Sequence, residues 1–157
     1  MPVYSAGLLM FNNSEKEIKV FLVHPGGPFF VKKDDGYWGI PKGLIEKDED
    51  HLDAAKREFE EETGIKPDGE FISLGTTTQN NNKIVYAWAF ETALTGQFQI
   101  TCNTFEMEWP PHSGKNQKFP EVDKGEFFNM EVAKKKVYSA QTIFLDRLSE
   151  YLKNNKK

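Results

Sequence analysis

Four glutamates near the end of one predicted helix are the residues of this sequence best suited to chemistry. Glu58, Glu60, Glu61 and Glu62 lie close together, and Arg57 directly precedes them. At about 100° of rotation per residue, Glu58, Glu61 and Glu62 share one side of a helix, whereas Glu60 faces away. The three repel one another where the helix dipole is already negative. Clustered carboxylate oxygens therefore indicate a site for a hard divalent cation such as Mg²⁺.

Segment 51–63 has the signals of a helix that would position these acids. Asp50 precedes it as an N-cap residue, and Gly64 and Pro67 follow its end. One side of this helix is apolar, which predicts packing against the protein interior. That apolar side consists of Leu52, Ala55 and Phe59.

A solvent-exposed acidic helix face is the simpler interpretation of such a charge run. The wider spacing favours a site instead. Residues 43–65 match the pattern G-x5-E-x7-R-E-U-x-E-E-x-G-U at every specified position, where U is a bulky aliphatic or aromatic residue. Fixed residues at an average usage of about 7% would give this match by chance on the order of 10⁻⁸ per start site.

This pattern is the signature of the Nudix hydrolases, and the chain resembles that family throughout 43–65. The resemblance implies an α/β (α+β) fold, an α/β/α sandwich with a mixed β-sheet, in a single domain over residues 1–157. It also implies metal-dependent hydrolysis of a phosphoanhydride bond in a nucleoside diphosphate linked to another moiety, such as a dinucleoside polyphosphate or a nucleoside triphosphate. The alternative is a catalytically inactive nucleotide-binding sensor, which usually lacks one or more of these carboxylates.

The resemblance also implies roles for individual residues. The metal, Mg²⁺ with Mn²⁺ as an alternative, would be held by the backbone carbonyl of Gly43 and by Glu58, Glu61 and Glu62. Arg57 would orient Glu58, and Arg57, Glu58 and Glu62 would form the catalytic set. Water is the expected nucleophile, because a metal ion lowers the pKa of water bound to it.

The resemblance implies two further roles. Glu49 would support the arrangement of the loop and the helix. The base that deprotonates water is left open between acids inside and outside the motif. The candidates are Glu58, Glu62, Glu106, Glu108 and Glu121.

Substrate contacts are predicted at Lys42, near the phosphates, and at Tyr86, which would stack on a nucleobase. The alternatives are a solvated loop lysine and a core tyrosine. Residues 38–43 are similar to the segment that precedes this motif in asymmetric diadenosine tetraphosphate hydrolases. The chain has Leu44 where those enzymes often have histidine, and Asn82 where they tend to have tyrosine.

Composition limits the class of protein. The chain has 157 residues, 38% hydrophobic and 28% charged, with a net charge of −4. This acidity argues against binding to bulk nucleic acid. Cys102 is the only cysteine, so an intramolecular disulfide is excluded.

Without a secretory leader or an apolar run of about 18 residues, we expect a cytoplasmic protein without a membrane segment. A small nucleotide is the expected partner, and the oligomeric state is left open.

The remaining segments predict a sheet and a final helix. The loop predicted at 24–28 would expose His24 or bring it to a phosphate, and a second loop spans 110–118. Segment 83–92 is apolar on both faces, which predicts a central strand. The final amphipathic helix begins at Ser139. Strands are predicted at 3–11, 18–23, 29–31, 70–78, 83–92, 98–109 and 121–128.

Overall fold

The computed structural model describes residues 2–13, 17–94, 102 and 104–155. Its strands are β1 (Val3–Asn12), β2 (Lys19–Pro25), β3 (Lys42–Leu44), β4 (Ile72–Gln79), β5 (Lys83–Glu91), β6 (Thr104–Glu108), β7 (Asn116–Pro120) and β8 (Val122–Asn129). Its helices are α1 (His51–Thr63), α2 (Met130–Lys136) and α3 (Thr142–Asn154), with a 3-10 turn, η1 (Ser139–Gln141), before α3.

A six-stranded mixed sheet forms the centre of the molecule. Its order is β4-β5-β1-β2-β8, and the short strand β3 also pairs with β1. Strands β1 and β5 run parallel, and the other pairs in this sheet are antiparallel. Ala6 of β1 lies opposite Gly43 on one side and Tyr86 on the other. Strand β1 therefore places the segment that enters α1 next to the middle of the sheet.

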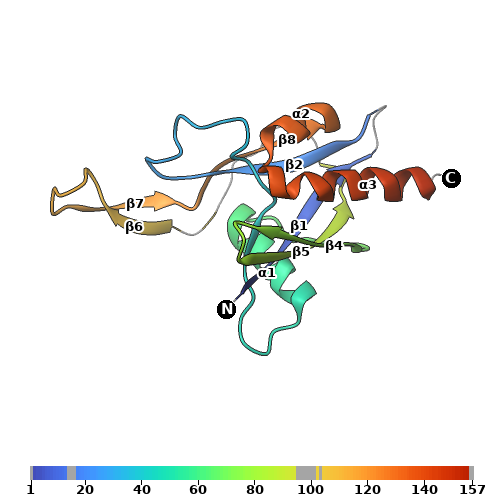
Figure 1. Ribbon diagram of the computed structural model, residues 1–157, viewed down its shortest axis with the longest axis horizontal. Helices are drawn as coiled ribbons and strands as arrows, with labels where there is room; N and C mark the ends of the chain where they lie inside the picture. The colour runs from blue at the N-terminus through green and yellow to red at the C-terminus, as the bar shows by residue number, and fades with distance from the viewer. Residues whose placement is uncertain (1, 14–16, 95–101, 103, 156–157) are drawn as a thin grey trace.

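Helices cover both faces of this sheet, which confirms the expected α/β/α sandwich with a mixed sheet. Helices α2 and α3 lie on one side in Figure 1, and α1 lies on the other. Alternate residues of β1 point into two separate cores. Leu9 and Phe11 pack with residues of α2 and α3, whereas Leu8 and Met10 pack with residues of α1. Strand β5 lies between β4 and β1, so the predicted central strand at 83–92 is confirmed.

Helix α1 has the predicted bounds and both predicted caps. The side chain of Asp50 accepts a hydrogen bond from the backbone N–H of Asp53. Gly64 adopts the left-handed conformation, with φ of 77°, and its N–H donates to the carbonyl of Glu60. Phe59 is fully buried against the sheet. The apolar side of α1 thus fixes which way its acids face.

Strands β6 and β7 form a separate two-stranded sheet that projects from the body of the molecule (Figure 1). The predicted loop at 110–118 is therefore wrong in its last part, because β7 begins at Asn116. The cross-strand pair of Phe105 and Phe119 explains this pairing. Of the strand predicted at 98–109, residues 98–101 lie outside the described part of the chain.

Three other predictions need correction. The strand predicted at 29–31 is wrong, because these residues form turns. The loop predicted at 24–28 begins too early, since β2 continues to Pro25 through pairing with β8. The final helix begins at Thr142, after the 3-10 turn that Ser139 starts. Among the described residues, no helix is long and apolar enough to cross a membrane.

The absence of a side chain at Gly7 of β1 allows β3 to lie close to β1. A Cβ atom at Gly7 would lie 2.5 Å from the carbonyl oxygen of Pro41 and 2.7 Å from Cβ of Lys42. We expect Gly7→Ala to lower the free energy of unfolding by about 1–3 kcal/mol, because the backbone must shift to relieve the overlap. Urea denaturation measures this change. Thr78→Ala, at an exposed position of β4, is the control and should change stability far less. Equal stability of the Gly7 variant and the parent protein would contradict the close packing.

Candidate active site

The carboxylate of Glu58 lies directly against the backbone of Gly43. Strand β3 brings Gly43 beside α1, and a Cβ atom at Gly43 would lie 2.1 Å from the carboxyl carbon of Glu58. A side chain at position 43 would therefore occupy the place of the Glu58 carboxylate. The absence of a side chain is what allows a helix carboxylate to lie against the backbone of a strand.

Arg57 holds three carboxylates at once. Its Nε and Nη2 donate to the two oxygens of Glu49, at 2.9 and 3.0 Å. Its Nη1 donates to Glu58 at 2.8 Å and to Glu61 at 3.3 Å, and Nη2 also donates to the carbonyl of Leu44 at 3.1 Å. A guanidinium has five N–H donors in a fixed plane, and each here has an acceptor. Arg57 thus links the loop before α1 to the acids on α1.

Glu62 is the most buried of the acids at the end of α1. Its carboxylate accepts a hydrogen bond of 2.7 Å from the backbone N–H of Lys42. Burial, together with the negative charges of Glu58 and Glu121, raises the pKa of Glu62 to about 8, although the Lys42 N–H and the charge of Lys42 act in the opposite direction. Such a carboxylate stays ionised at neutral pH most easily beside a cation.

The other two predicted ligands have different surroundings. Burial raises the pKa of Glu58, and the hydrogen bond from Arg57 opposes this effect. The Glu58 side chain is 15% exposed, whereas that of Glu61 is 40% exposed. Glu60 is exposed on the opposite side of α1, as predicted. The geometry therefore separates Glu60 from the other three acids.

A cavity of about 150 Å³ lies beside Glu62. Charged side chains at its edge come from Lys42, Glu62 and Glu121, which belong to β3, α1 and the residue before β8. Burial lowers the pKa of Lys42, and the charge of Glu62 opposes this effect. Tyr37 and Tyr138 line another part of the same cavity. Lys42 is therefore partly enclosed next to the acids, in contrast to a solvated loop lysine.

The structure distinguishes the three acids predicted as candidate bases outside the motif, Glu106, Glu108 and Glu121. Glu121 lines the cavity together with Glu62. Glu106 and Glu108 lie on the projecting strand β6. The carboxylate of Glu108 accepts hydrogen bonds from the backbone N–H groups of His112 and Gly114, so it supports a turn. The structure places Glu121 alone of these three beside the cavity.

Tyr86 lies at the other end of α1. Its ring packs against His51, the first residue of the helix, with ring centroids 4.4 Å apart. Its ring also lies 6.3 Å from that of Tyr4. Glu62 is about three turns further along α1, because each turn contains 3.6 residues. The structure therefore does not bring Tyr86 to the cavity beside Glu62.

His24 is placed differently from both predictions for it. The side chain is fully buried at the end of β2 instead of lying exposed in a loop. Its Nδ1 lies 2.8 Å from a carboxylate oxygen of Asp123, and its Nε2 lies 2.6 Å from the carbonyl oxygen of Lys33. These contacts connect the turn-rich segment 26–37 to β8. The sequence contained no signal for the pairing with Asp123, because that residue is 99 positions away along the chain.

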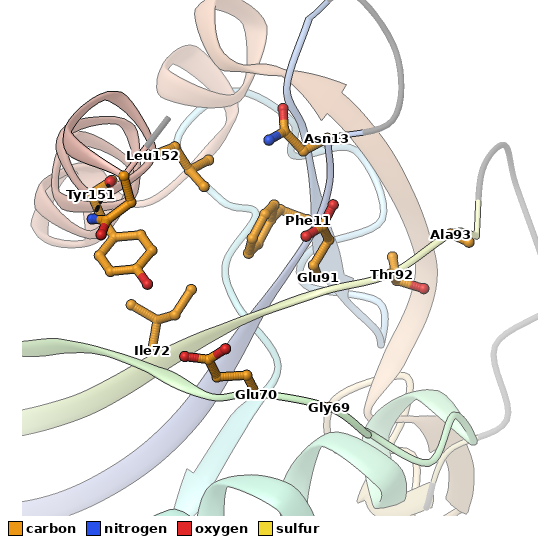
Figure 2. Close-up of a pocket in the computed structure, with 11 residues that line it drawn as sticks. Phe11, Asn13, Gly69, Glu70, Ile72, Glu91, Thr92, Ala93, Tyr151 and Leu152 are labelled. Atoms are coloured by element: carbon orange, nitrogen blue, oxygen red, sulfur yellow. Dashed lines mark hydrogen bonds between the residues drawn. The ribbon is translucent and has the colours of Figure 1, made fainter. Parts of the chain in front are cut away.

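A second cavity lies between the end of α3 and the sheet (Figure 2). It has a volume of about 680 Å³, and its lining includes Phe11, Glu70, Glu91 and Tyr151. None of the described residues that line it belongs to 43–65. Although it is larger, it is not the cavity that the motif residues form.

The chemistry of the donor set at the end of α1 determines whether a divalent cation fits there. In the part of the chain that the structure describes, no three His, Cys, Asp or Glu side chains already surround one point in a metal-binding arrangement. The carboxylates of Glu58 and Glu62 are nevertheless confined beside backbone of β3, and Gly43 leaves that backbone open. All of these donors are oxygen atoms with excess negative charge, which suits Mg²⁺ or Mn²⁺.

Comparisons with known proteins match most of the chain to one family model. The family model described as NUDIX domain matches residues 1–148. The chain is 37% identical over 83 residues to Nudix hydrolase 7 of Arabidopsis thaliana, which covers 53% of this chain and 27% of the relative. It is 38% identical over 60 residues to RNA pyrophosphohydrolase of Pelagibacter ubique, which covers 38% of this chain and 33% of the relative. The matches thus span about a third or less of these curated relatives.

Solved structures show the same fold. The Ap4A hydrolase of C. elegans in a binary complex has a TM-score of 0.64 at 21% identity, covering 97% of this chain and 98% of that chain. The NUDIX domain of Shewanella oneidensis NrtR, complexed with ADP ribose, has a TM-score of 0.63 at 15% identity, covering 97% of this chain and 89% of that chain. At these identities the likeness concerns the fold.

The contact between Arg57 and Glu49 predicts a pH dependence of stability. The hydrogen bonds from Arg57, with a further one from the backbone N–H of Glu46, lower the pKa of Glu49 from 4.5 to about 2. A carboxyl whose pKa is lowered in the folded state stabilises the protein above its unfolded value, and this contribution disappears as pH falls from about 4.5 to 2. We expect Glu49→Gln to lower the free energy of unfolding by on the order of 1 kcal/mol at pH 7.

The difference between parent and variant should shrink in the same acidic range. Urea denaturation from pH 7 down to pH 3 measures it, with Glu60→Gln as the control at an exposed position of α1. A stability difference that stays constant over this range would show that Arg57 does not hold Glu49 in the ionised form.

Proposed function

Since the chain belongs to the NUDIX domain family, we propose that it is a pyrophosphohydrolase that cleaves a phosphoanhydride bond in a nucleoside diphosphate linked to another moiety. One observation carries this proposal. Glu58 and Glu62 are confined against the backbone of β3, and Arg57 is already shared among three carboxylates. Acids that served only as a solvated surface would not be held in this way.

The proposed metal ligands are the carbonyl of Gly43 and the carboxylates of Glu58, Glu61 and Glu62, with Mg²⁺ as the ion and Mn²⁺ as the alternative. A divalent ion bound there would neutralise phosphate charge and lower the pKa of a bound water. Two of these groups are already restrained by the protein, because Glu58 contacts Arg57 and Glu62 contacts the Lys42 N–H. Glu61 is the most exposed of the three carboxylates, and its contact with Arg57, at 3.3 Å, is longer than that of Glu58.

The remaining residues would orient the reaction. Arg57 holds Glu58 through Nη1 and is itself held by Glu49. Its proposed role is therefore to position Glu58, a proposed metal ligand, and not to contact the substrate. Lys42 lies beside Glu62 and would attract the phosphates as a compact positive charge. For the proton from water, we propose the carboxylates at the cavity, Glu62 or Glu121, as the acceptor.

The substrate is proposed as a small nucleotide, such as a dinucleoside polyphosphate or a nucleoside triphosphate. The fold is shared with a protein named Ap4A hydrolase and with a domain bound to ADP ribose, so both compound classes belong in a test. We propose no membrane partner and no bulk nucleic acid, in keeping with the net charge of −4. A cytoplasmic location stays a prediction from the sequence.

A substrate panel tests the proposed reaction. Dinucleoside polyphosphates, nucleoside triphosphates, nucleotide sugars and ADP-ribose are incubated with Mg²⁺ or Mn²⁺, and the products are resolved by chromatography. We expect turnover of at least one compound and none with a chelator present. Binding without turnover across the whole panel would favour the alternative, a nucleotide-binding sensor on the same fold.

Substitution of single acids tests the site. We expect Glu62→Gln and Glu58→Gln each to lower turnover by about 100-fold or more, because each removes a charged oxygen ligand. Glu60→Gln is the matched control on the same helix and should retain activity, since its side chain is exposed on the other side. Circular dichroism and thermal unfolding verify that each variant is folded. Near-normal turnover in both Glu58 and Glu62 variants would contradict the proposed site.

The close approach at position 43 gives an independent prediction. Gly43→Ala adds a methyl group where the Glu58 carboxylate lies, so the carboxylate must move. We expect turnover to fall by about tenfold or more, whereas the free energy of unfolding changes by less than about 1 kcal/mol because the displaced group is the end of a side chain. Lys47→Ala, in the exposed loop before α1, is the control. Full activity of Gly43→Ala would show that Glu58 need not lie at this position.

A further inference from the structure

We infer that Gln141, itself held by Gln79, is a positioning residue for the proposed metal site, because it supports the backbone whose N–H group binds Glu62. This inference rests on the proposed function and adds a residue from outside 43–65. Gln141 belongs to η1, the 3-10 turn before α3, and its side chain lines the cavity beside Glu62. It acts through the backbone of Lys42 and contacts neither metal nor substrate.

Two backbone N–H groups in the segment that enters β3 donate to side chains. The N–H of Ile40 donates to Oε1 of Gln141 at 2.9 Å. The N–H of Lys42 donates to Oε2 of Glu62 at 2.7 Å. These two side chains come from different layers, since η1 leads into α3, and α3 and α1 lie on opposite faces of the sheet (Figure 1). The segment is therefore held by one side chain from each layer.

Pro41 couples the two hydrogen bonds. Its ring fixes φ at about −65°, and a residue that precedes proline is restricted to extended conformations. Few torsions are therefore free between the N–H of Ile40 and the N–H of Lys42. The carbonyl of Pro41 also accepts a hydrogen bond of 3.2 Å from the N–H of Leu8, on β1. A shift of Ile40 is thus transmitted to the N–H that contacts Glu62.

Gln141 is fixed firmly enough to act as a support. Its side chain and that of Gln79, the last residue of β4, are both buried, and its amide nitrogen donates to Oε1 of Gln79 at 3.1 Å. The hydroxyl of Thr77 donates to the carbonyl of Ala140 at 2.8 Å, which holds η1 against β4. Gly39 leaves room for the Gln141 side chain, because a Cβ atom there would lie 3.0 Å from its Oε1.

Glu62 is held differently from the other proposed carboxylate ligands. Arg57 donates to Glu58 and to Glu61, whereas Glu62 accepts its hydrogen bond from the backbone of Lys42. The orientation of Glu62 thus depends on where this backbone lies. Hydrogen bonds outside a metal's own ligands orient those ligands, and their loss typically lowers metal affinity or activity by about 10- to 100-fold.

Amide hydrogen exchange and Mn²⁺ binding test this role in the protein without nucleotide. Gln141→Met keeps the unbranched shape of the side chain and leaves only a weak acceptor for the N–H of Ile40. We expect the amide of Lys42 to exchange about tenfold faster in the metal-free protein, in line with the loss of one buried hydrogen bond. Mn²⁺ affinity, measured by calorimetry, should fall by about tenfold or more.

Arg147→Leu is the matched control. Arg147 connects α3 to β4 through hydrogen bonds to the carbonyls of Leu74 and Thr76, at 2.8 and 2.9 Å. Its loss weakens the same helix without touching the segment that enters β3. We expect this variant to be less stable, with the exchange rate of the Lys42 amide and the Mn²⁺ affinity both within about twofold of the parent values.

Gln141→Glu is the conservative variant. Its carboxylate still accepts from the N–H of Ile40, and the amide of Gln79 can rotate to donate to it. We expect this variant to retain slow exchange at Lys42, in contrast to Gln141→Met. Thermal unfolding verifies that each variant is folded.

Two results would overturn the inference. One is unchanged exchange at Lys42 and unchanged Mn²⁺ affinity in folded Gln141→Met. The other is an equal loss in Arg147→Leu, which would show that any weakening of α3 has this effect. If Gln141→Met does not fold, Gln79→Met removes the support of Gln141 and keeps its contact with Ile40. That variant should exchange about threefold faster at Lys42, and no change there would also overturn the inference.

Kinetics separate this role from direct contact with the substrate. With both proposals correct, Gln141→Met lowers kcat by about tenfold and changes the KM of the nucleotide far less. A change confined to KM would show that Gln141 contacts the substrate, which overturns the positioning role.

Failure of the proposed function would look different. If the parent protein neither binds Mn²⁺ nor turns over any compound of the panel, the proposed function fails, and exchange at Lys42 still decides whether Gln141 supports this backbone. If the support is wrong, Glu62→Gln still abolishes turnover, whereas Gln141→Met leaves kcat and Mn²⁺ affinity unchanged.

Discussion

The contact between α1 and β3 is the constraint on which the rest of the site depends. A helix carboxylate reaches the backbone of a strand because Gly43 has no side chain and because Gly7, on the neighbouring strand, lets β3 lie close to β1. The apolar side of α1, led by Phe59, holds the helix against the same sheet. The position of Glu58 therefore results from packing at two glycines and one aromatic residue.

This packing creates an electrostatic conflict that the protein resolves only in part. Arg57 neutralises charge near Glu49 and Glu58, and its five donors are all in use. Glu62 is partly buried beside Glu58 and Glu121, and its pKa is raised to about 8. A bound cation would relieve this conflict. The conflict therefore connects the fold of the motif to the chemistry proposed for it.

The cavity beside Glu62 joins the acids of α1 to an aromatic surface. Its charged part shares Glu62 with the end of α1, and its aromatic part is assembled from Tyr37 and Tyr138. These two parts are ordered by the contacts of Gln141 and His24.

The sequence by itself determined the local features: helix α1 with its caps, the central strand β5, and the spacing that separates Glu60 from the other three acids. These follow from periodicity and capping, which act over a few residues. Only the tertiary structure decided the location of His24, the association of Glu121 with Glu62, and the distance of Tyr86 from the cavity. Those relations depend on strand pairing and register between segments far apart in the chain, and a short stretch of residues contains no physical signal for them.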